Sequence, residues 1–412
     1  MSRLLSILIL CGCAGSLVDH AAFNAGGTPE CLQSCTTSVP GATRLCVGNT
    51  CTYECDGGRL KCAAGCCDVD ALSAGTSHTC AVVAGEARCW GANDKGQLGR
   101  AGLASSFSPV QPSGVTGTVT AIAAGWTHTC AVANGVANGE VWCWGDDTYG
   151  QLGDGSSGAG SSGPTPRKVA SLAGVVAIAA GSGHTCAVTA TQLFCWGRND
   201  FGQVGDGTSS EPRLAATVVP SVSGPFAAIA LGDLHTCALT SSGLSCWGAN
   251  AAGQLGNGTI APSKTPSPVS LSASFLGVGA NHSCAGDNSG ALSCWGANTQ
   301  GQVDSSMQDR RLPKGVLSNA RAVVGGVGHT CAVTSGQDMK CWGLNDKEQL
   351  GGSGHEESDV HISGVQAAAA GSKHTCALKN GGAFCWGWNN AGQLGSDPAT
   401  TTSAEPVAVS GR

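Results

Sequence analysis

The fold is decided by residues 121–132, which read Ala-Ile-Ala-Ala-Gly-Trp-Thr-His-Thr-Cys-Ala-Val. Two short motifs follow, Cys-Trp-Gly at 143–145 and Gly-Gln-Leu-Gly at 150–153. The His-Thr/Ser-Cys element recurs with His78, His128, His184, His235, His282, His329 and His374. The Cys-Trp-Gly element recurs with Trp90, Trp144, Trp196, Trp247, Trp295, Trp342 and Trp386. Seven copies of one unit therefore make up most of the chain.

The repeat has a period of about 49 residues between Cys80 in the first copy and Cys376 in the last. A period of this length is typical of propellers and solenoids, in which each unit buries its apolar face against its neighbours. His-Thr-Cys-Ala-Val is β-prone, and glycine interrupts each unit several times, so strands are expected and helices are not. The repeats predict an all-β array.

The spacing of the two cysteines in each repeat predicts a β-hairpin. In four copies they are nine positions apart, and for Cys376 and Cys385 the two residues midway between them are Asn380-Gly381, a strong hairpin signal. Counting outward from this turn makes the cysteines a non-hydrogen-bonded pair, whose Cα atoms lie ~4.5 Å apart and can carry a disulfide. Two copies would close through three-residue loops centred on Ser289 and Gly336, and one needs a longer loop. The predicted disulfides are Cys80–Cys89, Cys130–Cys143, Cys186–Cys195, Cys237–Cys246, Cys284–Cys294, Cys331–Cys341 and Cys376–Cys385.

Metal binding is the alternative interpretation of these repeats. The His and the first Cys of each copy share one face of a strand and the second Cys lies opposite, so each copy offers three possible zinc ligands. An oxidising compartment favours disulfides over seven identical metal sites. We therefore predict no metal ligand and no cofactor. The His is interpreted as a structural group that bonds a neighbouring loop, and the Trp as packing between blades.

The N-terminus has the pattern of an export signal. One positive charge at Arg3 precedes an apolar run at residues 4–10 that is interrupted only by Ser6. We predict a signal peptide at 1–12. The protein is expected to be exported, either as a membrane-anchored lipoprotein at the cell envelope or surface, or as a secreted protein.

The residues after the apolar run bear on whether the protein is anchored or released. The Leu-Cys-Gly-Cys at 10–13 resembles the lipobox of bacterial lipoproteins, in which a small residue precedes the lipidated cysteine. Gly12 precedes Cys13, so we predict lipid attachment at Cys13 and a tether at 13–30. Removal of Cys11 and acylation of Cys13 also leave 22 of the 24 cysteines, an even number. An ordinary secretory signal cleaved nearby is the alternative.

A cysteine-rich module is predicted at residues 31–67. A segment this short buries too little apolar surface to fold alone, and disulfides are the usual remedy. Eight cysteines can pair in roughly a hundred ways, and the sequence does not choose among them. Zinc is the alternative, although the segment contains no His. The eight are Cys31, Cys35, Cys46, Cys51, Cys55, Cys62, Cys66 and Cys67.

Composition excludes several classes of protein. A net charge of −6 argues against a nucleic-acid-binding chain, which would carry a basic patch. An apolar content of 42% is too high for a disordered chain. No apolar run reaches the ~18–20 residues of a membrane-spanning helix, so membrane contact is predicted through the lipid anchor only.

The repeated pattern resembles the regulator of chromosome condensation repeat. The pattern is Gly-x-x-His-Thr-x-Ala-Val/Leu followed by Trp-Gly-x-Asn/Asp-x-x-Gly-Gln-Leu-Gly, and its motifs recur seven times, with departures in single copies, over residues 68–412. The resemblance implies a seven-bladed β-propeller with four-stranded blades. The chain is similar to an exported, lipoprotein-type member, with paired cysteines where cytosolic members have apolar residues.

This resemblance also suggests how the ring closes. Other repeats begin with a Pro-Val strand, as at Pro109-Val110, whereas the first repeat follows directly on Cys67. The chain ends with another copy of this strand at 405–409. We therefore expect the C-terminal strand to complete the first blade and close the ring.

Two repeats depart from the pattern. The fifth has Gln302-Val303-Asp304 in place of Gln-Leu-Gly, and the sixth has Lys347-Glu348 where the motif has x-Gly. We interpret both blades as architectural. Asp154, Asp206 and Asp304 are interpreted as turn residues.

The sequence contains no recognisable catalytic constellation, so we predict no catalytic residue and no enzymatic activity. One polar cluster lies outside the repeats and consists of His355, Glu356, Glu357, Asp359 and His361. A metal role is possible there, but a solvated loop between blades explains it better.

The linkers between repeats vary in sequence, and variable loops on a rigid scaffold are where recognition usually occurs. They lie near 100–118, 155–170, 206–224, 257–275 and 351–365. We predict a monomeric binding scaffold that presents loops on one propeller face to an extracellular or envelope protein or a glycan. The sequence does not identify the partner-binding residues, and no aromatic or basic stripe across the loops is apparent.

Three alternatives stay open. The protein could inhibit a secreted enzyme, since a propeller with similar repeats blocks β-lactamases. It could be a hydrolase whose scattered acidic residues meet on the propeller face. By family analogy it could regulate a GTPase, because the best-known member exchanges guanine nucleotide on a small nuclear GTPase and binds chromatin. An exported acidic protein would have no access to either partner, so this role ranks last.

Overall fold

A computed structural model describes residues 39, 42–47, 50–63, 65–134, 138–158, 160–352, 358–396 and 399–410. The chain divides into two units, 1–54 and 55–412, which are described separately. In the first unit, β1 (Ala42–Val47) pairs with β2 (Thr50–Cys55). The division lies inside the cysteine-rich module expected at 31–67. No helix in the described part of the chain is long and apolar enough to cross a membrane.

The second unit begins with the 3-10 turn η1 (Asp56–Gly58) and the antiparallel pair β3 (Leu60–Cys62) and β4 (Gly65–Cys67). Seven four-stranded antiparallel sheets follow, each built from four consecutive strands. Blade 1 contains β5 (Val69–Ala74), β6 (His78–Val83), β7 (Glu86–Ala92) and β8 (Ser105–Val110). Blade 2 contains β9 (Val119–Ala124), β10 (His128–Ala133), β11 (Glu140–Gly145) and β12 (Gly163–Lys168). Blade 3 contains β13 (Ala177–Ala180), β14 (His184–Val188), β15 (Gln192–Gly197) and β16 (Arg213–Ser223).

Blades 4 to 7 repeat this order. Blade 4 contains β17 (Phe226–Leu231), β18 (His235–Thr240), β19 (Gly243–Gly248) and β20 (Ser263–Val269). Blade 5 contains β21 (Phe275–Val278), β22 (His282–Gly286), β23 (Leu292–Gly296) and β24 (Arg310–Leu317). Blade 6 contains β25 (Ala320–Gly325), β26 (His329–Thr334), β27 (Met339–Gly343) and β28 (Ser358–Val360). Blade 7 contains β29 (Val365–Ala370), β30 (His374–Lys379), β31 (Gly382–Trp388) and β32 (Thr402–Ala408).

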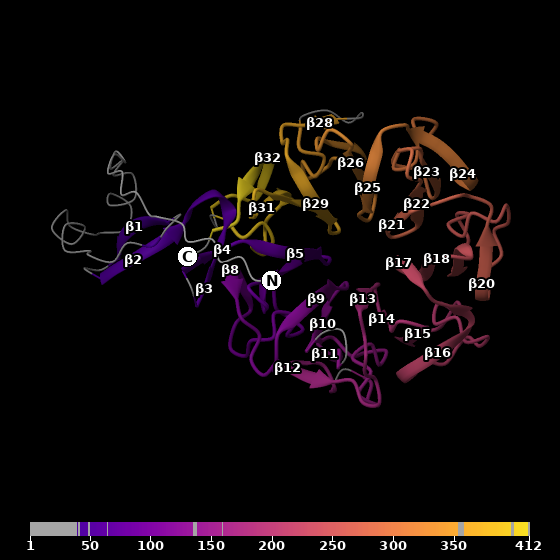
Figure 1. Cartoon of the computed structure of the whole chain (residues 1–412), viewed down its shortest axis with the longest axis horizontal. Coiled ribbons are helices and arrows are strands. Elements are labelled where there is room, and N and C mark those ends of the chain that lie inside the picture. The colour runs from indigo at the N-terminus through magenta and orange to yellow at the C-terminus, as the bar shows by residue number, and fades with distance from the viewer. Residues whose placement is uncertain are drawn as a thin grey trace, which may run out of the picture. The chain divides into compact units, whose positions relative to one another are not determined.

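The blades are arranged around a central axis, as the prediction of a seven-bladed β-propeller requires (Figure 1). The first strand of each blade lies innermost and contacts the first strands of its two neighbours. These strands are rich in small residues, such as the Ala-Ile-Ala-Ala of β9, because seven strands must share the space near the axis. The apolar core is divided among the joints between blades. At each joint the Trp of one blade packs into the core of the preceding blade, as Trp196 of blade 3 does beside Leu152 of blade 2.

The central hairpin of each blade has the register that the cysteine spacing predicts. Cys376 lies opposite Cys385, and the turn residues Asn380 and Gly381 have φ angles of 51° and 75°, as in the primed turns that match strand twist. Disulfide bonds join the two cysteines of all seven blades, with Cα–Cα distances of 4.0–4.1 Å. These distances fit non-hydrogen-bonded cross-strand pairs.

The seven-bladed fold is confirmed, but the expected role of the C-terminal strand is wrong. β32 pairs with β31 of its own blade, and the fourth strand of blade 1 is β8. The Pro-Val strands therefore end each blade instead of beginning the next one. After the third strand of a blade the chain turns back, and the Pro-Val segment pairs antiparallel with that third strand. The segment therefore becomes the fourth strand of the same blade.

The ring closes through contacts between blades 7 and 1. β29 lies beside β5. Leu60 of β3 is 1% exposed and packs with Trp90 of blade 1 and Leu378 of blade 7. The backbone N–H of Val69 donates to the carbonyl of Gly381 at 2.8 Å. The segment that precedes the first blade therefore helps to close the ring.

Candidate functional site

The repeated histidines form a ring of hydrogen bonds that we call the histidine belt. In every blade the imidazole Nε2 lies 2.8–3.0 Å from the hydroxyl of the Thr or Ser that follows the His of the next blade. The belt crosses the closure as well, because His374 of blade 7 contacts Thr79 of blade 1 at 2.9 Å. The interpretation of the His as a structural group that bonds its neighbour agrees with this geometry.

The hydrogen bonds of the belt determine the tautomer of each imidazole. The hydroxyl of Thr129 donates to the backbone carbonyl of Gln97 at 2.8 Å, and the indole N–H of Trp144 donates to the same carbonyl at 2.9 Å. A hydroxyl has one proton, so the Nε2–H of His78 must donate to Thr129. The Nδ1 atoms of all seven histidines are buried without a partner.

Burial also keeps these histidines neutral. It lowers the pKa of His78 to about 3 and that of His128 to about 4, and the other five also fall to about 3. Within the described residues, no group of three or more His, Cys, Asp or Glu side chains could hold a metal ion.

The remaining motif residues shape the loop between the third and fourth strands. In blade 1 the side-chain oxygen of Asn93 accepts the N–H of Leu98 at 2.8 Å, and that of Gln97 accepts the N–H of Lys95 at 2.9 Å. Equivalent pairs recur in every blade. The conspicuous motif therefore specifies architecture, and any binding site must use residues that vary between blades.

Variable residues collect at one end of the propeller. In an antiparallel blade the turn after the first strand and the loop after the third strand lie at the same end, which we call the loop face. Seven of the ten large hydrophobic side chains exposed in the described part of the chain lie in these turns and loops. They are Leu103, Trp126, Tyr149, Phe201, Ile260, Met307 and Val327.

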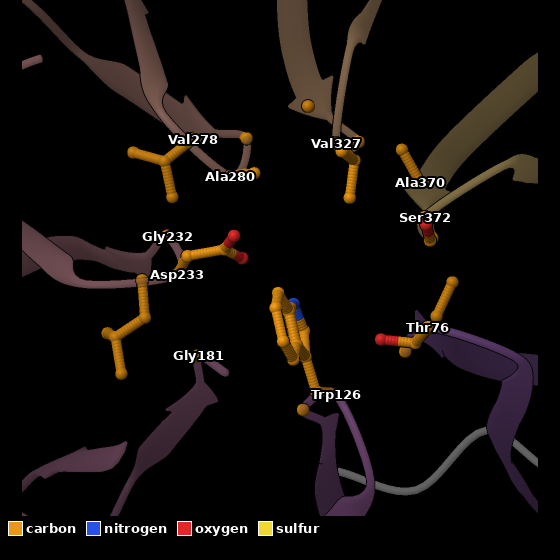
Figure 2. Close-up of a pocket in the computed structure, with 18 of the residues that line it drawn as sticks. Thr76, Trp126, Gly181, Gly232, Asp233, Val278, Ala280, Val327, Ala370 and Ser372 are labelled. Atoms are coloured by element: carbon orange, nitrogen blue, oxygen red, sulfur yellow. The ribbon is translucent and has the colours of Figure 1, made fainter. Parts of the chain in front are cut away.

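The centre of the loop face is a shallow depression of about 70 Å³ around the axis. Figure 2 shows the indole of Trp126 standing in this opening, with the Asp233 carboxylate on one side and Thr76 and Ser372 on the other. Trp126 is 45% exposed. Backbone hydrogen bonds between neighbouring turns form the rim, as from Trp126 N–H to Gly181 O at 3.2 Å.

Asp233 is the one ionisable side chain lining this depression. Burial raises its pKa to about 6, whereas a hydrogen bond from the Trp126 side chain and the charge of Arg198 favour the carboxylate. The depression therefore combines an exposed ring with an acidic group that titrates near neutral pH.

Exposed aromatic side chains of blades 2 and 3 lie on the loop face together with Arg198 of blade 3 and Asp233 of blade 4. Arg198 lies over the ring of Tyr149, 4.8 Å from its centroid, and pairs with Asp200 at 2.5 Å. Phe201 follows in the same loop and is 40% exposed. We call Trp126, Tyr149, Arg198, Phe201 and Asp233 the aromatic sector.

No aromatic stripe was apparent in the sequence because these residues are far apart along the chain. The missed signal is positional: Tyr149 and Phe201 occupy the same place, just before Gly-Gln, in consecutive repeats. Residues at one motif position in neighbouring blades must lie side by side on one face.

The other predicted site residues are only partly placed. Cys13, Cys31, Cys35, His355, Glu356 and Glu357 lie outside the described residues, and the side chains of Cys46, Cys51 and Asp359 are not described. Disulfides join Cys55 to Cys66 and Cys62 to Cys67. His361 of the expected polar cluster pairs with Glu405 at 3.3 Å. Asp154, Asp206 and Asp304 each accept the N–H two residues further on, as expected for turn residues.

Comparison with known sequences identifies the repeat. The RCC1-like domain profile matches residues 156–412, and profiles of the regulator of chromosome condensation (RCC1) repeat match 85–132 and 119–151. The chain is 32% identical over 337 residues to the ultraviolet-B receptor UVR8 of Arabidopsis thaliana, which covers 79% of this chain and 66% of that protein. It is also 32% identical over 202 residues to the human E3 ubiquitin-protein ligase HERC2, covering 46% of this chain and 4% of the ligase. The chain thus spans just under two thirds of the first relative and a small part of the second.

Solved structures share the fold. Human WBSCR16 is similar with a TM-score of 0.68 at 20% identity, covering 78% of this chain and 93% of that one. Prp20p of Saccharomyces cerevisiae is similar with a TM-score of 0.69 at 20% identity, covering 83% and 87%. The work on Prp20p describes its binding to Gsp1p and histones.

Proposed function

The chain belongs to the family of RCC1-like β-propellers, and we propose that it is an exported scaffold that binds a macromolecular partner through the aromatic sector. The partner is a protein or a glycan at the cell surface or outside the cell. The single observation that carries the proposal is the exposure of Trp126, Tyr149 and Phe201 on one face of a rigid ring.

The composition of the aromatic sector supports a binding role. Trp, Tyr and Arg are the residues that most often dominate binding energy at protein interfaces. An aromatic ring brings a large contact area at a low cost in conformational entropy. Here the backbone that carries these rings is held by the histidine belt and by a disulfide in every blade, so little ordering is required on binding.

The proposed location rests on the N-terminal pattern and on the cysteines. Disulfides form and persist in oxidising compartments, and each blade carries a buried pair. Intact and peptide masses of the mature protein, with and without reduction, test this part of the proposal. We expect eleven disulfides and a lipid adduct on Cys13. Free thiols with bound zinc would overturn export and would bring intracellular partners, including GTPases, back into consideration.

A capture experiment tests the binding proposal. The full chain, a Trp126→Ala/Tyr149→Ala/Phe201→Ala variant and a Val176→Ala control are cross-linked to cell-surface and culture-medium fractions and applied to a glycan array. Val176 is a suitable control because it is 47% exposed and lies outside the aromatic sector. We expect one partner to be retained by the full chain and the control, and at least tenfold less by the triple variant.

Two other results would contradict the proposal. Equal capture by the triple variant would place the binding surface elsewhere. Retention of nothing, together with substrate turnover by the purified protein, would make a hydrolase the better interpretation.

Inhibition of a secreted enzyme is the second candidate. A preorganised ring with exposed aromatic anchors suits tight binding to a rigid target. The two candidates separate once the partner is known, because an inhibitor lowers the turnover of a captured enzyme at a one-to-one ratio and a scaffold leaves it unchanged.

A further inference from the structure

The joint between blades 5 and 6 differs from the others. At five joints the Gly of the Gln-Leu-Gly motif, or of Gln-Val-Gly in the third repeat, lies against the indole of the next blade, and a Cβ on Gly153 would lie 2.6 Å from Trp196 Nε1. The five pairs are Gly153–Trp196, Gly205–Trp247, Gly256–Trp295, Gly351–Trp386 and Gly395–Trp90. At the joint of blades 5 and 6, Asp304 follows Val303 directly. Trp342 is 9% exposed there, whereas the other six repeat tryptophans are fully buried.

Hydrogen bonds show that the fifth repeat lacks this Gly altogether. Asp304 accepts the N–H of Ser306 at 2.9 Å and pairs with Arg310 at 2.7 Å. Asp206 of blade 3 makes the same two contacts, with Thr208 and Arg213. Asp304 is therefore the counterpart of Asp206 and not of the Gly that precedes it.

A cavity of about 520 Å³ lies at this joint and has Trp342 in its lining. Its apolar walls include Val303, Met307, Val316 and Leu317. The volume falls within the ~300–1,000 Å³ range of small-molecule pockets. The residues that depart from the motif, which we interpreted as architectural from the sequence, therefore line a cavity of ligand size.

The only carboxylate among the lining residues is already satisfied. Asp304 accepts hydrogen bonds from Asn298 at 2.7 Å and from Arg310 at 2.8 Å, in addition to that from Ser306. Burial raises the pKa of Asp304, but the hydrogen bonds from Ser306, followed by the Arg310 pair, outweigh it and hold the pKa below its usual value. Because these partners already satisfy the Asp304 carboxylate, the cavity does not require a charged ligand.

We propose that this cavity binds an uncharged aromatic ring. The ring would pack against the indole of Trp342 and the thioether of Met307, contacts that are favourable beyond the area they bury. The ring can come from a free small molecule or from an aromatic side chain of a peptide. The cavity is separate from the aromatic sector, so this proposal does not depend on the proposed function.

Fluorine NMR of two probes tests the site. 4-Fluorotoluene represents the free molecule, and a Gly-Ser-Xaa-Ser-Gly peptide with 4-fluorophenylalanine at Xaa represents the side chain. We expect saturable broadening of the 4-fluorotoluene resonance by the full chain. Saturable broadening of the peptide as well would identify a peptide side chain as a source, and its absence would restrict the site to small molecules.

Two independent variants add atoms to the lining of the cavity. One inserts a Gly between Val303 and Asp304, which restores the motif over Trp342. The other is Gly315→Leu, because Gly315 lines the cavity and a Cβ there meets no atom within 4 Å. We expect at least tenfold weaker binding in both. Gly163→Leu is the matched control, since Gly163 of β12 has equally open surroundings but is not a lining residue.

The proposal is overturned if 4-fluorotoluene at its solubility limit shows no saturable binding to the full chain. It is also overturned if both folded variants bind the probe as tightly as the full chain does. Folding of each variant is checked by its thermal unfolding transition.

Discussion

The joint between blades 3 and 4 and the joint between blades 5 and 6 share their inner contacts, but the Gly that lies over the Trp in the first is absent from the second. His184 contacts Thr236 at 3.0 Å in the first, and His282 contacts Thr330 at 2.8 Å in the second. The Trp indole donates to a Gln carbonyl at 3.0 Å in the same way at both joints. The belt and the hairpins therefore maintain the ring at both joints, while the loop above the Trp differs between them.

The largest expected effect is a loss of stability in acid that both joints share. The folded pKa of each belt histidine is about 3 or 4, below the unfolded value of 6.5, so the unfolded state binds more protons as the pH falls below 6.5. The free energy of unfolding is therefore fully present above pH 6.5 and is lost between 6.5 and about 3. Seven histidines remove up to about 10 kcal/mol per pH unit. Asp233, with a raised pKa, acts in the opposite sense, but it is one group against seven.

Denaturant unfolding between pH 7.5 and 5 measures this slope. His184→Gln and His282→Gln should each lower it by about one seventh, because each removes one of seven similar groups. A smaller change from His282→Gln would show that water enters the open joint and that its histidine titrates in the folded state. Stability that is independent of pH over this range would contradict the buried, neutral belt.

The second prediction concerns the Gly itself. Gly205 has a φ of +82°, and a Cβ there would lie 2.5 Å from Trp247 Nε1. Gly205→Ala should cost about 2–5 kcal/mol, from backbone strain together with overpacking. Insertion of Gly after Val303 should change the free energy of unfolding by less than about 1 kcal/mol, since it adds a residue where the loop has room. Chemical unfolding of both variants tests the contrast, with Gly163→Ala as the neutral control.

Much of the fold could be predicted because residue spacings within each repeat determine the local backbone geometry. The nine-residue spacing of Cys376 and Cys385 around Asn380-Gly381 specifies a hairpin register, and the period specifies the array. Closure could not be predicted in this way. The Pro-Val segments have strand propensity on their own, and only pairing in space shows that β8 belongs to the blade before it.

The binding surfaces were harder to predict for a related reason. Trp126 and Phe201 are 75 positions apart and meet on one face only because the ring brings neighbouring blades together. The Gln-Val-Asp of the fifth repeat was visible as a departure from the motif. Its consequence depends on Trp342 of the next blade, which the sequence of one repeat does not contain.

The smallest predicted effect concerns the disulfides of blades 3 and 5. They lie in the central hairpins of the blades and not in the loops that differ between the two joints. Cys186 and Cys195 are nine positions apart in blade 3, and Cys284 and Cys294 are ten apart in blade 5. Replacing either pair by Ala should lower the free energy of unfolding by up to about 3 kcal/mol, because both crosslinks close loops of nearly equal length. Calorimetry of the two double variants should therefore give transitions within a few degrees of each other. A much larger loss in blade 5 would show that the open joint depends on its disulfide, and that the Gly at the other joints stabilises them in a way that the belt alone does not.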